Sequence, residues 1–487
     1  MSKMRPRIVT LLTLSVLFTL LPGACASREV RAARSGDIEA LESFLADGGN
    51  VDERGRGEQT LLMAALENRQ RAAAEFLLDA GASLSATDSR GRTPLIHAAQ
   101  SDLPGLARRM IDAGARIDVR DAEGKTALLH SAEAGAVRTF ELLLAEDASV
   151  TVQDFNGDTA LHAAAASGAT GFVEKLIDRG ASADTRNSEG RTALHRAASH
   201  GSAEVASELL RAGARPGLGD TRGRTPLMLA SEAGSTELVK LLLEEGADPL
   251  QEDDEGWTAL GFALARSAAD RSGVQRSVTL LREAGGEIPG DEQIGAEIAF
   301  LAVRSGNADI VSLLLDSGLN PNARNSRGET LLTASLAHEA IVGQLLSSEA
   351  DPNLPDRSGN RPLMLAVEGN REHSVRRLLS AGADPDISGL DRETPLMKAV
   401  AADQLDITRQ LLLAGASANH RDRQENTALH VAAENASERV IRLLLTAGGD
   451  ASLKNIDGKE PVDIAVEEGR SDSVIELFVS AGGTPPS

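Results

Sequence analysis

The sequence predicts an all-α solenoid of about 14 repeated units, each a helix–turn–helix preceded by a β-turn finger. Three observations predict this fold: a threonine recurs in steps of 33 residues, a glycine recurs 21 residues after it, and little sequence lies outside that period. A fixed period of this size is typical of stacked units that bury their apolar faces against their neighbours. The threonines are Thr60, Thr93, Thr126, Thr159, Thr192, Thr225 and Thr258, then Thr330, Thr394 and Thr427.

The unit that begins at Thr192 shows how the residues predict the elements. A short first helix is expected to end at Gly201. The second helix is expected over Ser202 to Arg211, where its valine and leucines fall on one face. Gly213 should end that helix, because glycine readily adopts the left-handed conformation found after many helices. The polar segment 219–224 is rich in turn-forming residues and leads into the next unit.

The glycine 21 residues after the threonine is expected to adopt a positive φ in most units. Asp147 and Glu349 take its place in two units, and there a side chain should cost backbone strain. In the last unit the glycine comes one residue late, at Gly482, which predicts an extra residue near the end of the second helix. The column contains Gly48, Gly81, Gly114, Gly180, Gly213, Gly246, Gly318, Gly382, Gly415 and Gly448.

The period is broken in two places. An interval of 39 residues follows Thr258, and the next unit keeps its position at Glu297 but loses the motif. The six extra residues are expected between the two helices, around Ala268 to Gly273. An interval of only 31 residues separates Thr330 from Arg361, so two residues should be lost from the same region of that unit.

The irregularity after Thr258 predicts two sub-stacks, residues 25–286 and residues 287–487, each closed by a cap at its free end. Counting back one period from Thr60 reaches Ser27, so a polar N-terminal unit should begin where the leader ends. The last unit begins at Glu460 and forms the other cap. Because the stability of such arrays is a sum of nearest-neighbour terms, we expect local opening to begin at the junction.

The repeated segments resemble the ankyrin repeat, whose core reads T-P-L-H-x-A-A. Residues 159–164 read Thr-Ala-Leu-His-Ala-Ala, residues 427–433 read Thr-Ala-Leu-His-Val-Ala-Ala, and Pro-Leu follows Thr93, Thr225 and Thr394. The threonine hydroxyl should cap the first helix, and the proline should occupy its first turn. The resemblance covers nearly the whole chain after about the first 26 residues. It implies protein binding through the turn tips and the exposed side of the first helix.

The resemblance places the residue just before each threonine on the surface that faces a partner. This position is mostly basic in the first half of the chain, holds the only tryptophan in the centre, and is polar to acidic afterwards. Exposed aromatic and arginine residues are frequent anchors of protein interfaces. The alternative is that the rings pack flat against the neighbouring finger. Phe155 is added because it is also expected on a finger, between Asp154 and Asn156. The predicted partner-binding residues are Arg92, Lys125, Phe155, Asp158, Arg191, Arg224, Trp257 and Glu329.

Residues 1–24 are predicted to be a signal peptide. Three basic residues precede an uncharged, mainly apolar run from Ile8 to Leu21, which is shorter than the roughly 20 residues that a bilayer requires. Residues 21–25 resemble a bacterial lipobox, so Cys25, the only cysteine, is the predicted lipidation site. The alternative is cleavage after Ala26. Both predict a bacterial cell envelope and the periplasm, and lipidation predicts attachment to a membrane, with the outer membrane favoured.

The charge balance argues against a nucleic-acid partner. The formal net charge is −22, and loss of the leader with its three basic residues would bring it near −25. Such a surface repels phosphates, and the sequence holds no basic stripe. It would attract a basic protein partner. The alternative is that the acidic residues are only a solvated surface.

No arrangement of residues in the sequence predicts catalysis or metal binding. There is no H-E-x-x-H, no pair of cysteines and no G-x-S-x-G, and the repeats leave no room for a separate catalytic domain. Of nine histidines, His162, His195 and His430 occupy the motif position, where a hydrogen bond to the turn backbone is expected. We therefore predict a protein that is not an enzyme and needs no cofactor or metal.

These observations predict a non-catalytic protein–protein interaction scaffold in the bacterial envelope, which binds its partner through the concave face and the finger loops. Two alternatives stay open. One is an immunity-type inhibitor that occludes a secreted toxin, and the other is a surface-exposed or secreted effector directed at a host. The partner is not identified by the sequence, because a fold does not determine a function.

Overall fold

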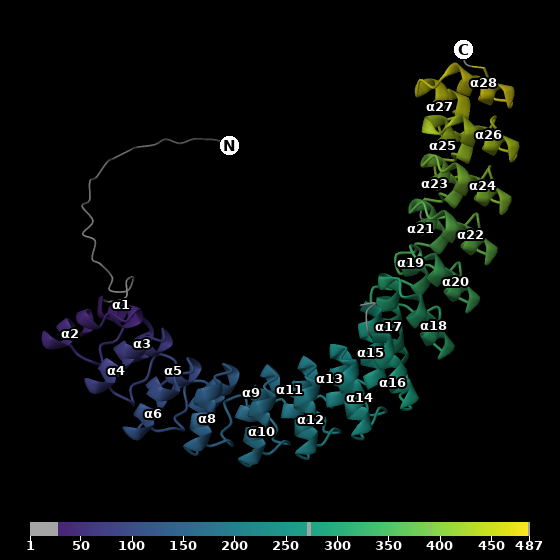
Figure 1. The fold of residues 1–487 in the computed structure, drawn as a ribbon. Coiled ribbons are helices and arrows are strands. Elements are labelled where there is room, and N and C mark those ends of the chain that lie inside the picture. Colours follow the sequence, from purple (N-terminus) through teal and green to yellow (C-terminus); the bar gives the residue numbers. More distant parts are fainter. Residues whose placement is uncertain (1–27, 270–273, 390, 486–487) are drawn as a thin grey trace, which may run out of the picture. The chain divides into compact units, whose positions relative to one another are not determined.

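The computed structural model describes residues 28–269, 274–389 and 391–485, and within them the fold is entirely helical. These residues form 28 α-helices and one 3-10 helix, Arg56–Glu58, without a strand. Isolated β-bridges join Arg54 to Thr60, Glu252 to Thr258 and Arg324 to Thr330 at the bases of three fingers. The predicted all-α repeat solenoid is therefore confirmed (Figure 1). The repeat number of about 14 stays a prediction, and Cys25 lies outside the described residues.

The chain divides into two compact units, Met1–Ser188 and Glu189–Ser487. The first unit contains ten described helices in consecutive pairs. They are α1 (Arg28–Ser35), α2 (Ile38–Ala46), α3 (Leu61–Glu67), α4 (Arg71–Asp79), α5 (Pro94–Gln100), α6 (Pro104–Asp112), α7 (Ala127–Glu133), α8 (Val137–Ala145), α9 (Ala160–Ser167) and α10 (Thr170–Asp178).

The second unit continues the same alternation over a longer part of the chain. The predicted boundary between residues 286 and 287 falls inside this unit and stays a prediction. Its described helices are α11 (Ala193–His200), α12 (Ala203–Arg211), α13 (Pro226–Ala233), α14 (Thr236–Glu244), α15 (Ala259–Ala269), α16 (Val274–Glu283), α17 (Glu292–Ser305), α18 (Ala308–Asp316), α19 (Leu331–Ser335), α20 (Glu339–Ser347), α21 (Pro362–Glu368), α22 (Glu372–Ser380), α23 (Pro395–Ala401), α24 (Leu405–Leu413), α25 (Ala428–Asn435), α26 (Glu438–Thr446), α27 (Pro461–Glu467) and α28 (Asp472–Ser480).

The threonine of each regular unit caps the first helix, as predicted. The Thr60 hydroxyl accepts a hydrogen bond from the Met63 backbone N–H at 3.3 Å, and Thr394 does the same for Met397. Such a cap satisfies one of the N–H groups that the first helical turn leaves without a partner. Where proline follows the threonine, as at Pro94, it occupies the first turn and removes an N–H that had no helical acceptor.

The glycines after the second helices have the positive φ angles that the sequence predicts. Gly213 has φ 88° and Gly482 has φ 104°. Asp147 and Glu349 also adopt the left-handed conformation, with φ 56° and 66°, although each carries a side chain. A residue other than glycine in this conformation costs roughly 1–2 kcal/mol, which confirms the expected strain at both positions.

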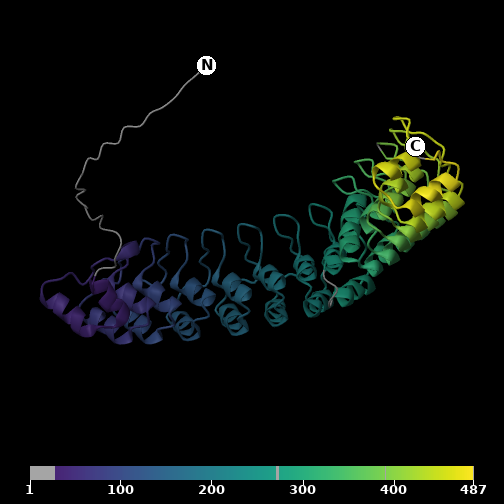
Figure 2. The same cartoon turned by 90° about the horizontal axis from the view of Figure 1, so that it is seen from above.

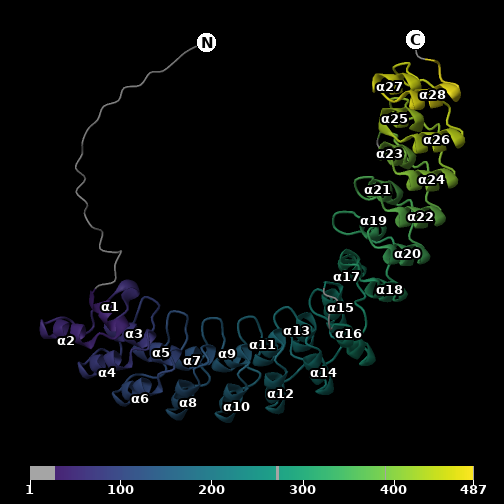
Figure 3. The ribbon, with the colours of Figure 1, turned by 45° about the horizontal axis from the view of Figure 1, so that its top comes forward.

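The helices of each unit form two rows that pack mainly within themselves. In the first unit, α3 packs against α1 and α5, and α4 packs against α2 and α6. In the second unit, α13 packs against α11 and α15 in the same way. Figure 3 shows the two rows, and Figure 2 shows the fingers projecting from one edge of each unit.

The core lies between the rows, where small and aliphatic side chains exclude water. Leu61, Leu209 and Leu396 are fully buried, and each such leucine contributes about 1.5–3 kcal/mol. Phe140 on α8 and Phe172 on α10 stack with ring centroids 4.0 Å apart. Among the described helices, none has both the length and the apolar character that a membrane crossing requires.

The unit expected to begin at Glu297 differs from its prediction. Helix α17 has 14 residues and starts at Glu292, so Glu297 lies inside a helix and not at its cap. The Asp291 carboxylate accepts hydrogen bonds from the Gln293 and Ile294 N–H groups, which starts the helix early. Residues that would form a finger in other units are therefore helical here.

The other irregularities fall near the connections between helices. Helix α15 extends to Ala269 and α16 begins at Val274, so the predicted insertion lies partly in α15 and partly at 270–273, outside the described residues. The two-residue deletion was placed wrongly between the helices. Helix α19 has only five residues, and its connection 336–338 to α20 is as long as the connection 369–371 after α21, so the deletion shortens the first helix. The extra residue of the last unit was placed wrongly. It lies in the connection 468–471, because α28 has nine residues, like α26.

Candidate partner-binding surface

Each regular finger is organised by an aspartate or asparagine five residues before the threonine. In the first unit, Asp88 Oδ1 accepts hydrogen bonds from the backbone N–H groups of Arg90 and Arg92, both at 2.9 Å. The side chain thus holds the turn closed without help from a partner. The residues that bond in this way are Asp88, Asp121, Asp154, Asp220, Asp253, Asn325, Asp356, Asp422 and Asn455.

Successive fingers are also bonded to one another through their backbones. In the first unit, the Phe155 N–H donates to the Glu123 carbonyl oxygen at 2.9 Å. In the second, the Ile456 N–H donates to Gln424 at 2.9 Å. The fingers within each unit therefore form a preformed surface, which binds with a small entropy cost because little has to be ordered.

Two of the predicted basic residues in the first unit are bonded inside their own repeat. Arg92 Nη2 lies 2.8 Å from Asp88 Oδ2, and the Arg92 side chain is only 14% exposed. Lys125 Nζ lies 2.7 Å from Glu133 Oε1, and its side chain is 16% exposed. Both cations hold the finger against the first helix and present little free charge to a partner.

Arg191 and Arg224 of the second unit converge on a single carboxylate. Their Nε atoms lie 3.2 and 3.6 Å from Asp220 Oδ2, so one finger is bound to the one before it. Burial raises the pKa of Asp220, but hydrogen bonds from Arg222, Arg191 and Arg224 outweigh that effect and hold it below its usual value. The pKa of Asp88 is lowered by the same balance of burial against Arg92 and Arg90.

The two predicted acidic residues are half-buried and bonded to the finger asparagines. Asp158 Oδ1 accepts from Asn187 Nδ2 at 2.7 Å, and Glu329 Oε2 accepts from Asn325 Nδ2 at 2.6 Å. Six of the eight predicted residues therefore take part in the internal structure of the fingers. Their role in binding stays a prediction.

The two predicted aromatic residues differ in exposure. Trp257 is half-buried, with its ring centroid 5.1 Å from that of Phe262 on α15, so it packs within its repeat. Phe155 is 68% exposed at a fingertip, and the Arg120 guanidinium lies 5.2 Å from its ring centroid. Phe155 is therefore the more accessible of the two aromatic candidates.

The histidines of the fingers are bonded to fixed partners. His195 Nε2 lies 3.1 Å from the Arg224 carbonyl oxygen and His430 Nε2 lies 3.1 Å from that of Lys459, which confirms the predicted hydrogen bonds to the turns. His97 Nε2 lies 3.1 Å from Asp88 Oδ2. Burial lowers the pKa of both His97 and His430. Within the described residues, no three His, Cys, Asp or Glu side chains gather as a metal site would require.

A second recurring contact joins each finger to the end of its first helix. The residue just before the threonine position bonds to the residue seven after that position, and we call this contact the finger–helix pair. It joins Gln59 to Glu67, Arg92 to Gln100, Lys125 to Glu133, Arg224 to Glu232 and Lys459 to Glu467. Sequence reasoning missed this pair and the finger aspartates, although both recur with the 33-residue period.

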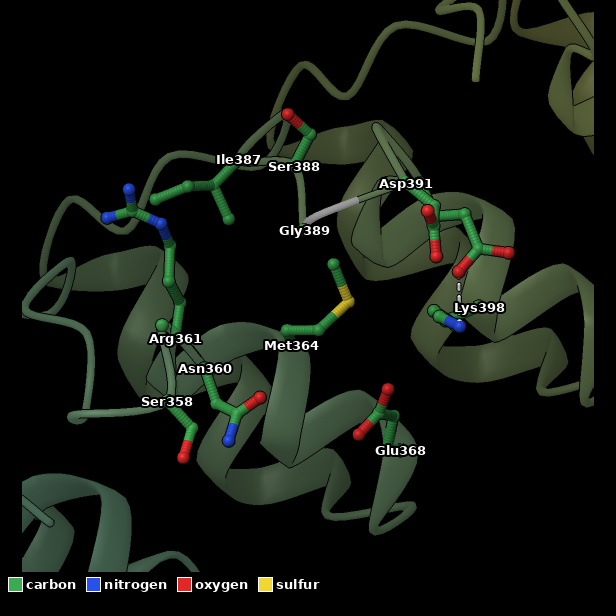
Figure 4. Close-up of a pocket in the computed structure, with 12 residues that line it drawn as sticks. Ser358, Asn360, Arg361, Met364, Glu368, Ile387, Ser388, Gly389, Asp391 and Lys398 are labelled. Atoms are coloured by element: carbon green, nitrogen blue, oxygen red, sulfur yellow. Dashed lines mark ion pairs between the residues drawn. The ribbon is translucent and has the colours of Figure 1, made fainter. Parts of the chain in front are cut away.

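One cavity, of about 180 Å³, lies beside the first helices α21 and α23 and the fingers that precede them (Figure 4). Here Gly389 occupies the position that an aspartate or asparagine fills in the regular fingers. Met364 and Glu368 of α21 line one side, and Lys398 of α23 lines the other. A Cβ at Gly389 would lie 4.0 Å from Met364 Cε, so the missing side chain borders the cavity.

Stacked helix pairs with preformed fingers define a helical repeat protein whose surface is suited to contact with another macromolecule. The model of the family described as ankyrin repeats (3 copies) matches residues 30–121, 86–154, 102–187, 128–220, 194–289, 299–389 and 396–484. The chain belongs to the ankyrin repeat family, whose members are generally protein–protein interaction modules and are typically non-catalytic. No curated protein matches the chain.

Proposed function

We propose that the protein is a non-catalytic scaffold of the bacterial cell envelope that binds a protein partner through its fingers and the exposed faces of its first helices. The observation that carries this proposal is the closed set of hydrogen bonds within and between the fingers, exemplified by Asp88 and Phe155. A surface held in this way meets its partner without prior folding. The exposed Phe155 ring supplies a candidate anchor.

The charge of the chain supports a basic partner. At a formal net charge of −22, the acidic side chains that are not paired within the repeats would draw such a partner towards the surface. Many of the basic residues near the fingers are instead neutralised by finger carboxylates, as Arg92 is by Asp88. These paired cations therefore add little positive charge to the surface that a partner would meet.

Site-specific photocrosslinking in the native envelope tests the binding surface. A crosslinking residue at Asn156, on the fingertip beside Phe155, is expected to capture a single protein partner. The matched control carries the same residue at the exposed Glu174 on α10, in the row of second helices. Capture only from position 174, or the same proteins from both positions, would contradict binding through the fingers.

The envelope location rests on the leader and Cys25, so its test is separate. Mass spectrometry of the mature N-terminus is expected to find a lipidated cysteine at position 25. A mature chain that begins at Ser27 would support ordinary cleavage and periplasmic release. An intact leader on a cytoplasmic chain would contradict the proposed location.

An immunity-type inhibitor is a second candidate, favoured by the strongly acidic composition, which would complement a basic toxin. A secreted toxin encoded beside this protein, together with rescue of toxin-exposed cells by the purified chain, would support it. Loss of activity of a resident envelope enzyme on deletion would favour the scaffold instead. Recovery of the chain inside host cells would support the remaining alternative, an effector directed at a host.

A further inference from the structure

The repeat at Arg361 lacks the finger–helix pair that a cation completes in other repeats. In the repeat at Glu460, for comparison, Lys459 Nζ lies 2.6 Å from Glu467 Oε2. The corresponding residues here are Asn360 and Glu368, and the shorter Asn360 side chain turns back to Asp356, with Nδ2 2.9 Å from Oδ2. Within the described part of the chain, no direct hydrogen bond or ion pair reaches the Glu368 carboxylate, whose charge acts on the Lys398 ammonium only at longer range.

The neighbouring finger also lacks its own central side chain. At Gly389 the turn is closed by backbone alone, with the Gly389 N–H donating to the Glu393 carbonyl oxygen at 3.1 Å. In the repeat at Glu460, the equivalent Asn455 fills this place and donates from Nδ2 to Asn426 Oδ1 at 3.0 Å. The cavity therefore lies where one repeat lacks the cation of the finger–helix pair and the next finger lacks its central polar side chain.

The walls of the cavity combine apolar and acidic side chains. Met364, 9% exposed, points into the space with Ile387 opposite, as Figure 4 shows. Glu368, Asp391 and Glu393 provide three carboxylates, of which Asp391 is paired with Arg423 and Glu393 with Lys398. The Lys398 ammonium is paired with Glu393, and the hydrogen bond that it donates to Glu393 raises the pKa of Lys398, so this cation already has a partner.

Arg361, the other cation of the cavity wall, also has a hydrogen-bond partner. Arg361 donates from Nη1 to the Asn353 carbonyl oxygen at 2.8 Å, and its guanidinium lies away from Glu368 in Figure 4. The cavity consequently contains one carboxylate, Glu368, that has no direct ion pair among the described residues. Its chemistry suits a side chain with a long aliphatic stem and a positively charged head.

We propose that this cavity receives an arginine or lysine side chain of the protein partner, with the stem over Met364 and the cation beside Glu368. The inference rests on the proposed function, since it names one contact of the scaffold with its partner. The bound cation takes the place that Lys459 and Arg224 occupy in their own repeats. The partner is thus a protein whose contacting segment presents a basic residue.

Methionine methyl NMR of the full chain tests the cavity without knowledge of the partner. The sequence has seven methionines, and Met364→Leu identifies the signal of Met364. Nα-acetyl-arginine amide, the probe, is expected to shift that signal in a saturable manner at millimolar concentrations. Nα-acetyl-citrulline amide, which has the same shape without the charge, should shift it much less.

Two substitutions at equivalent repeat positions distinguish the cavity from general surface charge. Glu368→Gln is expected to weaken binding of the arginine probe by about twofold to fivefold, as for one exposed ion pair. Glu434→Gln is the matched control. Glu434 is also exposed, and an asparagine, Asn426, occupies the other position of its finger–helix pair, as Asn360 does for Glu368. The neighbouring finger differs, because Asn455 stands there in the position of Gly389. That control should leave the affinity unchanged. Both variants should keep the far-UV circular dichroism of the parent chain.

Several outcomes would overturn the inference. They are an unchanged Met364 signal, equal shifts with citrulline, stronger binding of an acidic probe such as Nα-acetyl-glutamate amide, or equal losses in the two variants. The outcome for the proposed function is separate. If a partner crosslinks at the fingers while arginine does not shift the Met364 signal, the scaffold function is supported and the cavity contact is contradicted. If arginine binds but no partner is captured, the reverse holds.

Discussion

At the scale of single residues, the stability of the fingers is concentrated in a few buried carboxylates. Asp88 is 6% exposed and bonds to two backbone N–H groups, the Arg92 guanidinium and the His97 ring. A buried polar group of this kind is costly to remove, because its partners are left without hydrogen bonds. The finger aspartates therefore stabilise the fold directly. They affect binding only indirectly, because they hold the fingers in shape.

Replacement of the Asp88 side chain tests this argument. Asp88→Ala is expected to lower the free energy of unfolding by about 2–4 kcal/mol, since it leaves Arg92 and His97 buried without their anion. Urea denaturation followed by circular dichroism measures the loss. The exposed fingertip substitution Asp254→Ala serves as the control and should cost less than about 0.5 kcal/mol. Similar losses in both variants would contradict the role assigned to Asp88.

The buried histidines predict the direction of the pH dependence. Burial lowers the pKa of His97 and His430 in the folded chain, whereas the unfolded chain titrates near pH 6.5. The unfolded state therefore binds more protons as the pH falls below about 6.5, and the stability contributed by these neutral rings declines. Between pH 7 and 5, the parent chain should lose more stability than His97→Gln, measured by urea denaturation at each pH.

The buried aspartates add a second decline at lower pH. The pKa values of Asp88 and Asp220 lie below their usual value in the folded chain, so their contribution is complete above about pH 4 and is lost below it. A chain that became more stable between pH 7 and 3 would contradict both assignments.

At the scale of single elements, the ends of the second helices are set by backbone conformation. Asp147 and Glu349 have φ 56° and 66° where most repeats place glycine. Asp147→Gly and Glu349→Gly are each expected to raise the free energy of unfolding by about 0.5–1 kcal/mol, because relief of strain exceeds the added freedom of the unfolded chain. Urea denaturation of each variant measures the gain.

The reverse substitution provides the control for this prediction. At Gly213, φ is 88° and an added Cβ would meet no atom within 4 Å, so a side chain there changes only the backbone energy. Gly213→Asp should therefore destabilise by a similar amount. If Gly213→Asp proved neutral, strain would not explain the glycine column.

The elements from α15 to α17 should be the least protected part of the second unit. Helix α17 replaces a finger by helix, so the bonded series of fingers is interrupted before the finger of Asn325. Amide hydrogen exchange, followed by mass spectrometry, is expected to be faster over residues 258–300 than over α11–α14 and α23–α26. Uniform protection across the second unit would contradict local opening at this place.

At the scale of the whole molecule, the formal net charge of −22 should govern how fast a partner arrives. Electrostatic steering of a basic partner falls as salt screens the charges, while contacts at short range persist. The association rate with the captured partner is expected to fall by about tenfold or more between low and high ionic strength, with a smaller change in dissociation rate. A rate that is independent of salt, measured by stopped-flow, would show that the acidic residues are only solvated.

Most of the fold follows from local patterns of residues. The threonine cap, the proline in the first turn and the glycine after the second helix each act within one repeat, so their positions could be predicted before the structure. Helix α17 could not, because Asp291 starts it early and competes with the repeat position at Glu297. The extra residue of the last unit was misplaced for a related reason, since periodicity counts residues without saying where a connection lengthens.

The sequence by itself determined that the chain is an ankyrin repeat solenoid, because the information lies in a period that most helix pairs obey. Only the tertiary structure decided which finger residues are free to meet a partner. Arg191 and Asp220 are 29 residues apart in sequence and become bonded only when neighbouring repeats stack. The cavity beside Gly389 and Glu368 arises in the same way, from side chains of two successive repeats. Contacts between repeats depend on their packing, and no motif within one repeat records it.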